Sequence, residues 1–262
     1  PLCGSPARVS RTGALGALLL ATPAQGSGSV ALNRDVPNNH SAGKLWTAVV
    51  PVRSLTAGKS RLFTGSSPAP GLIEAFARDV LRACGGSANI GRTIVVSPDA
   101  SIETLAREAN SEFVLEPSAS GINEAIASVR AICEPDQPVI AILADTPCLT
   151  GATLDAVLAH AGDYDVSFVA DAAGTGSTMW CTRIPTACPF FGSRSRARHR
   201  ASGAVELGST ARSGDDASLW TRARRDVDTE VDLWDAHRIG LGPATTRVYE
   251  QGDARAGVPL HD

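Results

Sequence analysis

From Lys44 onward, short apolar runs alternate with segments whose apolar residues recur at helical spacing. The runs WTAVVPV, TIVVS, FVLEP, PVIAILAD and DVSFVAD are rich in β-branched residues, and helical patterns such as GLIEAFARDVLRACG separate them. Strands that are apolar throughout must be covered on both faces, and the intervening helices supply that cover. The alternation therefore predicts an α/β fold built on a mostly parallel, doubly wound sheet.

The two ends of the chain lack this alternation. Residues 1–44 are rich in Gly, Ser, Ala, Pro and Asn, and apart from GALGALLLA they show no period. That segment has the outline of a signal peptide, but its apolar core is short, so an upstream extension of a cytoplasmic enzyme is the favoured interpretation. We expect an irregular extension over 1–44, one domain over 45–248, and a loose tail over 249–262, with weak attachment from Gly242 onward.

Charge and cysteine usage narrow the possible classes. A formal net charge of −3 provides no bulk attraction for nucleic acid or for an anionic membrane, so an anionic ligand must be met by locally placed Lys and Arg. The six cysteines are scattered without a C-x-x-C pair, which favours reduced thiols in the cytoplasm over disulfides or structural zinc. No apolar run approaches the roughly 18 residues of a membrane span.

Polar residues follow several of the predicted strands. They are the Gly58–Arg61 turn, the Gly121–Asn123 turn and Asp145, which follows the most apolar strand. Ligands of doubly wound sheets bind beyond the carboxyl ends of the strands, so these residues should gather on one rim.

The Gly58–Arg61 turn contains Gly-Lys-Ser, the ending of a phosphate-binding P-loop. A P-loop needs a glycine five residues before Gly58, where this chain has Arg53, so the full pattern is missing. Lys59 and Arg61 are nevertheless placed to neutralise charge on a triphosphate as it is transferred. The alternative is a solvated basic turn.

Three aspartates are candidate ligands for a hard cation such as Mg²⁺. Asp226 and Asp228 lie two residues apart, so in extended chain their carboxylates point the same way. Asp145 can supply a further oxygen ligand at the rim. Capping of the following turn is the alternative for Asp145, and capping of the following helix is the alternative for Asp228, although Thr229 could provide that cap instead.

Two further segments carry donors for an anion. Gly174–Thr178 (GTGST) offers flexible backbone and three hydroxyls, and Phe191–His199 (FGSRSRARH) combines hydroxyls with guanidinium groups near a predicted helix start. The alternatives are a simple connecting turn and a solvated basic face or RNA-binding patch. Without interleaved aromatic residues, nucleic acid is disfavoured. His199 alone supports neither a catalytic triad nor a zinc site.

Taken in order, these motifs resemble a known family. VPVRSLTAGKSRL, GINEAI, LADTPCLT, FVADAAGTGST, FGSRSRARH, SGAVEL and DVDTEVDL are similar to the 2-phospho-L-lactate or phosphoenolpyruvate guanylyltransferases of coenzyme F-420 (deazaflavin) biosynthesis. IGLGPATTRV resembles the actinobacterial branch, whose members use phosphoenolpyruvate. The resemblance implies a nucleotidyltransferase fold akin to that of the molybdenum-cofactor guanylyltransferases, with AGKSRL as the nucleotide-phosphate loop.

The resemblance also implies roles for individual residues. Ser177, Gly192 and Ser195 match positions that hold phosphoenolpyruvate, with Arg198 as a further candidate for the acceptor. The matches to the Mg²⁺-binding carboxylates are Asp145, Asp226 and Asp228. The chain departs from the family pattern at Thr146 (usually Leu), Ser193 (usually Pro) and Ser177 (usually Thr).

The expected reaction follows from these assignments. GTP lies with its phosphates on Gly58, Lys59 and Arg61 and its nucleoside near Gly121 and Asn123, and GMP passes to the phosphate of phosphoenolpyruvate or 2-phospho-L-lactate. Pyrophosphate leaves, and a downstream enzyme takes the product. The alternatives are a nucleotidyltransferase of the same fold that uses a molybdopterin or sugar phosphate, or a non-catalytic nucleotide-binding module.

Overall fold

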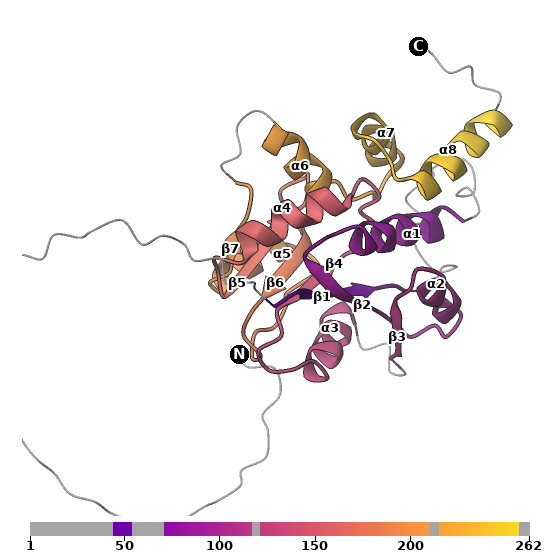
Figure 1. The fold of residues 1–262 in the computed structure, drawn as a ribbon. Helices are drawn as coiled ribbons and strands as arrows, with labels where there is room; N and C mark the ends of the chain where they lie inside the picture. Colours follow the sequence, from indigo (N-terminus) through magenta and orange to yellow (C-terminus); the bar gives the residue numbers. More distant parts are fainter. Residues whose placement is uncertain (1–43, 54–70, 117–120, 210–214, 257–262) are drawn as a thin grey trace, which may run out of the picture. The chain divides into compact units, whose positions relative to one another are not determined.

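The computed structural model describes residues 44–53, 71–116, 121–209 and 215–256 (Figure 1). Within them, seven strands form one sheet in the order β3-β2-β1-β4-β6-β5-β7. The strands are β1 (Trp46–Pro51), β2 (Ile90–Ser97), β3 (Glu112–Leu115), β4 (Val139–Ile142), β5 (Val166–Ala170), β6 (Ser177–Thr182) and β7 (Val205–Glu206). The helices are α1 (Leu72–Gly85), α2 (Ile102–Glu108), α3 (Ile122–Ala131), α4 (Gly151–Ala161), α5 (Ser195–Ala201), α6 (Asp215–Arg224), α7 (Glu230–Ile239) and α8 (Pro243–Ala256).

The predicted α/β class and the mostly parallel sheet are confirmed. β1 pairs in parallel with β2 and β4, β2 with β3, and β5 with β7. β6 is the exception, because it runs antiparallel to both β4 and β5. Each of the five apolar runs named from the sequence contains a strand.

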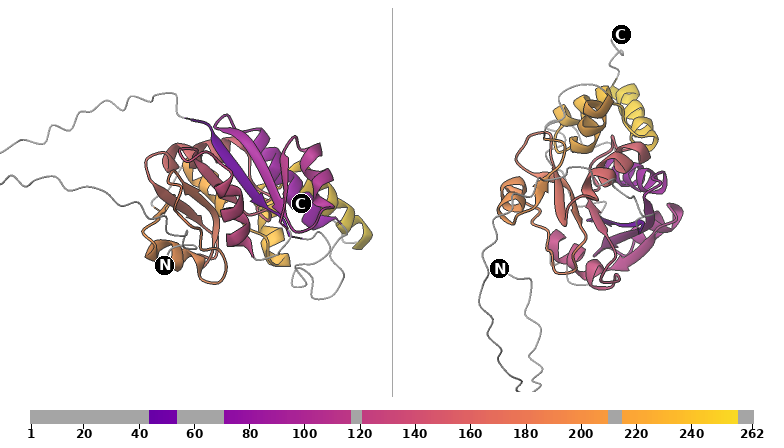
Figure 2. Two further views of the ribbon diagram at one scale, coloured as in Figure 1. Left: turned by 90° about the horizontal axis from the view of Figure 1, so that it is seen from below. Right: turned by 60° about the vertical axis from the view of Figure 1, so that its left-hand side comes forward.

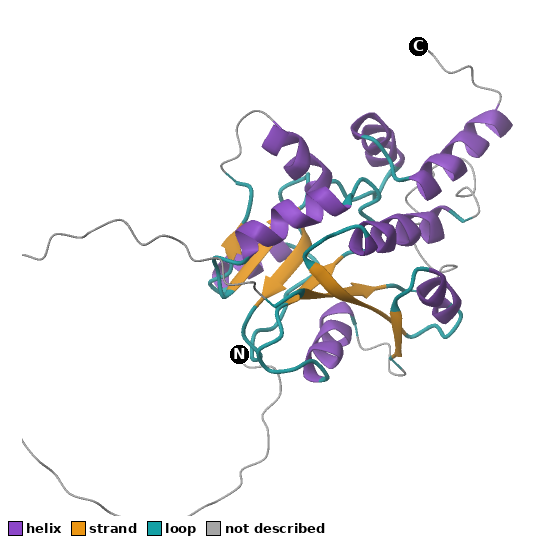
Figure 3. Cartoon of the chain, viewed as in Figure 1, coloured by secondary structure: helices purple, strands orange, loops and turns teal. Residues whose placement is uncertain are grey.

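Apolar side chains fill both faces of the sheet, as the continuous apolar strands require. One cluster packs α1, α2, α4 and α6 against residues such as Val50, Ile140 and Met179. A second packs α3 against the opposite face, around Val49, Phe168 and Trp180. Figures 1 and 3 show α3 on the other side of the sheet from α1 and α4. Val49 and Val50, which are consecutive residues of β1, thus point into different clusters.

The C-terminal segment differs from its prediction. The expectation of a weakly attached tail from Gly242 is wrong for Pro243–Ala256, which form α8, and the proposed domain boundary at 248 falls inside this helix. α8 (yellow in Figure 2) packs against α1. Its residues Val248 and Tyr249 lie against a third apolar cluster that includes Phe76 and Leu233. This helix was not predicted, because the segment PATTRV has low helical propensity and α8 is stabilised by tertiary packing instead.

The buried Asp79 of α1 satisfies the start of α8. Its two carboxylate oxygens accept hydrogen bonds from the backbone N–H groups of Ala244 (2.9 Å) and Thr245 (2.8 Å). The first N–H groups of a helix have no partner within the helix, and an anion there also interacts favourably with the helix dipole. A side chain 165 residues away in sequence therefore caps the last helix.

The reversed β6 brings its first residues to the rim where the parallel strands end. In the pairing register Met179 lies opposite Ile142, the last residue of β4, and Ser177 lies opposite Ala170, the last residue of β5. The N–H of Leu143 then donates to the carbonyl of Thr178 (3.0 Å), just beyond β4. β6 accordingly starts where a ligand of this fold class is expected.

Asp145 lies three residues beyond β4 rather than at its end, on a turn whose Thr146 hydroxyl donates to the carbonyl of Leu143 (2.9 Å).

No helix within the described ranges is both long enough and apolar enough to span a membrane.

Candidate functional site

The segment that carries Asp226 and Asp228 lies beside Asp145. The N–H of Val227 donates to the carbonyl of Asp145 (3.0 Å), so the two loops are joined through their backbones. Val227 is fully buried, whereas Asp226 is half-buried and Asp228 is exposed. The buried Val227 thus separates two aspartates that are both more exposed than it is.

Asp226 lies in a strongly negative environment. Burial raises the pKa of its carboxyl, and the charges of Asp145, Asp171 and Asp228 raise it further, to about 7. Both effects disfavour the ionised form. Three acidic side chains, two of them from other loops, therefore act on Asp226.

These carboxyl groups do not form a closed cage in the structure. Across the described ranges, no three His, Cys, Asp or Glu side chains are arranged as a preformed metal cluster. Their chemistry nevertheless fits a hard cation, because carboxylate oxygens are the ligands that Mg²⁺ prefers. A cation among Asp145, Asp226 and Asp228 would also offset the repulsion that raises the pKa of Asp226.

The capping alternative for Asp228 is resolved by its neighbour. Thr229 is the N-cap of α7: its hydroxyl accepts from the N–H of Asp232 (3.2 Å), and the Asp232 carboxylate accepts from the N–H of Thr229 (2.9 Å). This reciprocal pair is a capping box. The side chain of Asp228 is therefore not required to cap α7.

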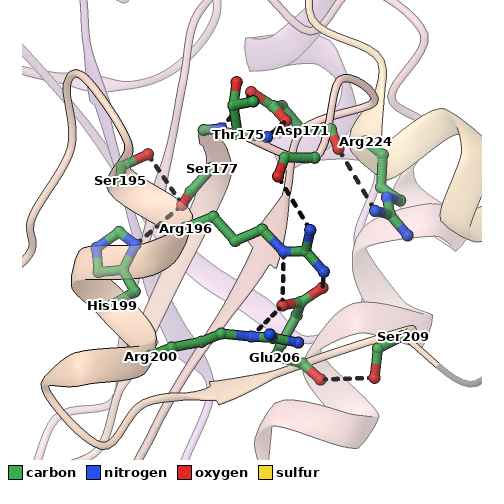
Figure 4. A network of polar contacts seen from close by, with 12 residues as sticks. Asp171, Thr175, Ser177, Ser195, Arg196, His199, Arg200, Glu206, Ser209 and Arg224 are labelled. Carbon is green, nitrogen blue, oxygen red and sulfur yellow. Dashed lines mark hydrogen bonds and ion pairs between the residues drawn. The ribbon is translucent and has the colours of Figure 1, made fainter.

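A cluster of hydroxyl and imidazole groups lies at the start of β6 (Figure 4). The hydroxyl of Ser195 donates to Ser177 Oγ (3.1 Å), and Ser177 Oγ is 2.9 Å from His199 Nδ1. All three side chains are buried. β6 and α5 thus bring together Ser177 and Ser195, two of the residues predicted to bind the phosphorylated substrate, and place His199 beside them.

The Gly174–Thr178 turn is held by Asp171. The carboxylate of Asp171 accepts from the N–H groups of Thr175 (2.9 Å) and Gly176 (2.6 Å). A side chain at residue 176 would collide with that carboxylate, so glycine is needed there. The expectation that this turn offers free N–H donors is therefore wrong for these two groups, because Asp171 already uses them.

Asp171 also connects the two halves of the rim. Its charge acts on Asp226, while its hydrogen bonds fix the turn that leads into Ser177. Sequence reasoning did not select it, although a signal was present: FVAD, like ILAD, is an apolar strand that ends in Asp. Asp171 consequently interacts with both the acidic residues and the turn that precedes Ser177.

The turn at Phe191 is fixed by the side chain of Asn123. Asn123 Oδ1 accepts from the N–H of Phe191 (2.8 Å), and Asn123 Nδ2 donates to the carbonyl of Phe191 (3.1 Å). Gly192 follows with a φ of 111°, a left-handed conformation that favours glycine. Asn123 was predicted to contact the nucleoside. In the structure both ends of its amide instead bind the backbone of Phe191, in the turn predicted to hold the phosphorylated substrate.

The arginines of the FGSRSRARH segment divide into two groups. Arg196 and Arg200 both pair with the buried carboxylate of Glu206 (2.9 and 2.8 Å), which ties α5 to β7. Arg198 lies 5.5 Å from the centre of the Phe190 ring and is exposed, as is Arg194. Arg194 and Arg198 therefore carry the positive charge of this segment that is not used by Glu206.

Some predicted residues cannot be placed. Gly58, Lys59 and Arg61 lie outside the described residues. Gly121 is among the described residues and comes directly before α3. Its φ is 131°, and a side chain at this position would crowd the carboxylate of Glu124. This explains the glycine by conformation, while a contact of Gly121 with a nucleotide stays a prediction.

Comparison with known proteins identifies similar chains. The family described as "Guanylyl transferase CofC like" matches residues 46–199. The phosphoenolpyruvate guanylyltransferase of Streptomyces coelicolor is 39% identical over 210 residues, which cover 78% of this chain and 95% of that protein. The enzyme of the same name from Mycobacterium marinum is 34% identical, with 76% and 91% covered.

Among solved structures, the fold matches a protein of Desulfovibrio desulfuricans G20 inferred to be a nucleotide-diphospho-sugar transferase. The TM-score is 0.50 at 15% identity, and the match covers 75% of this chain and 97% of that one. At this identity the match supports the fold alone.

Proposed function

This chain belongs to the family of CofC-like guanylyl transferases, and we propose that it moves GMP from GTP onto the phosphate of phosphoenolpyruvate. The products would be a guanosine diphosphate-linked enolpyruvate and pyrophosphate. The choice of acceptor is supported by relatives whose name specifies phosphoenolpyruvate and of which this chain spans more than nine-tenths. In its order of motifs the chain also resembles the enzymes of coenzyme F-420 biosynthesis, where a downstream enzyme would consume the product.

One observation carries this proposal: Asp171 joins an acidic group and a donor group at one rim. The charge of Asp171 acts on Asp226, as do those of Asp145 and Asp228, and the Asp171 carboxylate accepts from the N–H of Gly176, next to Ser177. A nucleotidyl transfer brings two highly charged phosphates together, so it needs both positive charge and fixed donors. A binding module would not need the two groups side by side.

Asp145, Asp226 and Asp228 are the residues that would hold Mg²⁺. When bound, the cation would neutralise phosphate charge that develops during transfer. Support comes from the Val227–Asp145 hydrogen bond, which joins the two backbone segments that carry the three carboxylates. The side chains would have to close around the cation as it binds.

On the acceptor side, this chain would act by binding and orientation. A phosphate monoester is already anionic at neutral pH, so no general base is required to activate its oxygen. Ser177, Ser195 and the Gly192 turn, with Arg198 at its edge, would hold the acceptor in line with the α-phosphorus of GTP. Positioning of two reactants supplies a large part of such a rate enhancement.

The direct test is turnover. The protein is incubated with GTP and Mg²⁺ plus phosphoenolpyruvate, 2-phospho-L-lactate or a sugar phosphate, and pyrophosphate release and product mass are measured. We expect release with phosphoenolpyruvate and a product of the guanylated mass. Turnover with another acceptor but not with either phosphoacid would reassign the substrate, and GTP binding without turnover would favour a non-catalytic module.

The metal assignment is tested by Asp226→Asn, with Asp163→Asn as the matched control on an exposed turn. We expect Asp226→Asn to reduce turnover by at least about 100-fold, as loss of a ligand and a charge at a transfer site does. Mg²⁺ should raise the melting temperature of the wild type and of Asp163→Asn but not of Asp226→Asn. Near-normal turnover in Asp226→Asn would remove the metal assignment.

The cytoplasm is the proposed compartment. The proposal rests on the scattered spacing of the six cysteines, which lacks the paired pattern of a disulfide framework.

A further inference from the structure

His199 is a buried polar residue for which the assignments above give no role. Its ring is inaccessible to solvent and lies among three aromatic rings, with centroid distances of 5.2 Å to Phe168, 6.1 Å to Phe190 and 5.4 Å to Phe191. Burying an imidazole is costly unless both of its nitrogens have partners. The partners found here determine where its proton is.

The backbone of Phe190 fixes the tautomer. The N–H of Phe190 lies 2.8 Å from His199 Nε2, and because a backbone N–H can only donate, Nε2 must be the unprotonated acceptor. The ring proton of the neutral imidazole is then on Nδ1. Burial and the positive charge of Arg198 lower the pKa of His199 to about 4, so this neutral form prevails at pH 7.

The tautomer in turn fixes the hydrogen bonds of Ser177. With its proton on Nδ1, His199 donates to Ser177 Oγ, and Ser195 donates to the same oxygen. A hydroxyl oxygen has two lone pairs, and both are now used as acceptors. The O–H of Ser177 can then act only as a donor to a third group.

We propose that His199 is a positioning residue, which acts through Ser177 by holding its hydroxyl as a donor toward an oxyanion of the phosphorylated acceptor. The inference rests on the proposed function, because it takes Ser177 as a contact of the acceptor. It adds a residue that itself touches no substrate, and it restricts the group bound at Ser177 to an acceptor of hydrogen bonds, a phosphate or carboxylate oxygen.

The proposal has a structural alternative, in which His199 only fills the space between β5 and the Phe190–Phe191 segment. The substitution His199→Phe separates the two, because it preserves an aromatic ring but removes the donor to Ser177. His199→Asn is the conservative partner: its amide nitrogen can replace Nδ1–H, whereas its shorter side chain no longer reaches the N–H of Phe190.

The first measurement is a comparison of Michaelis constants. We expect His199→Phe to raise the KM for phosphoenolpyruvate about 10-fold, which is the effect of one hydrogen bond to a charged group, and to leave the KM for GTP within about twofold. His199→Asn should recover most of the affinity for phosphoenolpyruvate. Equal changes in both KM values, or no recovery with Asn, would favour the space-filling role and overturn the inference.

A double-mutant cycle with Ser177→Ala tests whether His199 acts through Ser177. If it does, Ser177→Ala/His199→Phe should have the same KM for phosphoenolpyruvate as Ser177→Ala alone, because the donor to Ser177 has lost its target. Multiplicative effects of the two substitutions would show independent roles and would contradict the proposal.

A readout that needs no turnover separates this inference from the proposed function. Nitrogen chemical shifts of the histidine rings, assigned with His199→Phe, should show His199 as the neutral Nδ1–H tautomer at pH 7. An Nε2–H tautomer or a protonated ring would sink the inference even in an active enzyme. The expected tautomer together with no turnover on any phosphoacid would instead refute the proposed function.

Discussion

At the scale of single residues, Asp226 and His199 are ionisable groups whose pKa values shift in opposite directions. Asp226 has a raised pKa because burial and its acidic neighbours disfavour the anion, whereas His199 has a lowered pKa because burial and Arg198 disfavour the cation. A bound cation would stabilise the ionised form of Asp226. His199 stays neutral and keeps its hydrogen bonds to Phe190 and Ser177.

His199 makes stability depend on pH. Its pKa is about 4 in the folded protein against 6.5 for a free imidazole, so the unfolded chain binds the proton more readily and folding loses stability as pH falls from about 6.5 to 4. The loss amounts to about 3 kcal/mol for a fully buried ring. Urea unfolding of wild type and His199→Phe at pH 7 and 4 should show this loss in the wild type alone.

The control for that experiment is His160→Phe, since His160 is an exposed residue of α4. This variant should lose stability with falling pH just as the wild type does. Parallel pH curves for the wild type and His199→Phe would mean that His199 is protonated at little cost in the folded state.

At the same scale, the sequence identified some site residues and missed others for physical reasons. Asp145, Asp226 and Asp228 were recognisable because they follow strands or alternate along extended chain, and the structure brings their segments together. Asn123 was expected at a nucleoside, but its amide lies on the backbone of Phe191, 68 residues away. Local spacing carries no information on such a long-range partner.

At the scale of elements, α3 holds the Phe191–Gly192 turn in place through Asn123. Asn123→Ala should therefore raise the KM for phosphoenolpyruvate about 10-fold, since two hydrogen bonds that hold the Phe191–Gly192 turn are lost. The KM for GTP should stay within about twofold, as should both constants in the control Ser128→Ala on the same helix. A rise confined to the KM for GTP would instead support the nucleoside contact expected from the sequence.

α8 depends on a cap supplied by α1. Asp79→Ala removes both acceptors from the first N–H groups of α8, and we expect it to lower the free energy of unfolding by about 2 kcal/mol, measured with urea. Asp79→Asn, which retains one acceptor oxygen, should lose about half as much. A change below about 0.5 kcal/mol in Asp79→Ala would show that packing on α1 alone holds α8 in place.

At the scale of the whole described domain, the fold could be predicted further than the site. β1, β2, β4 and β5 could be predicted as apolar runs, because a strand covered on both faces has few polar positions. β3 could be predicted from its apolar residues, although it is a partly exposed edge strand. The direction of β6 could not be predicted, since an apolar run has the same composition in either direction. α8 was missed because its stability comes from Asp79 and α1 rather than from its own residues.

The reversed β6 has a consequence for how such an enzyme can change. Residues 171–199 form a continuous stretch that leaves the sheet at β5, returns along β6 and supplies Ser177, Gly192, Ser195 and His199, whereas Gly58–Arg61 and Asp145 belong to the half that precedes it. The residues proposed to bind the small phosphoacid thus lie in one continuous stretch, whose Phe191–Gly192 turn is held from outside by Asn123 of α3. Exchange of residues 171–199 together with Asn123 is therefore expected to change which phosphorylated molecule receives the nucleotide, while the nucleotide donor stays the same.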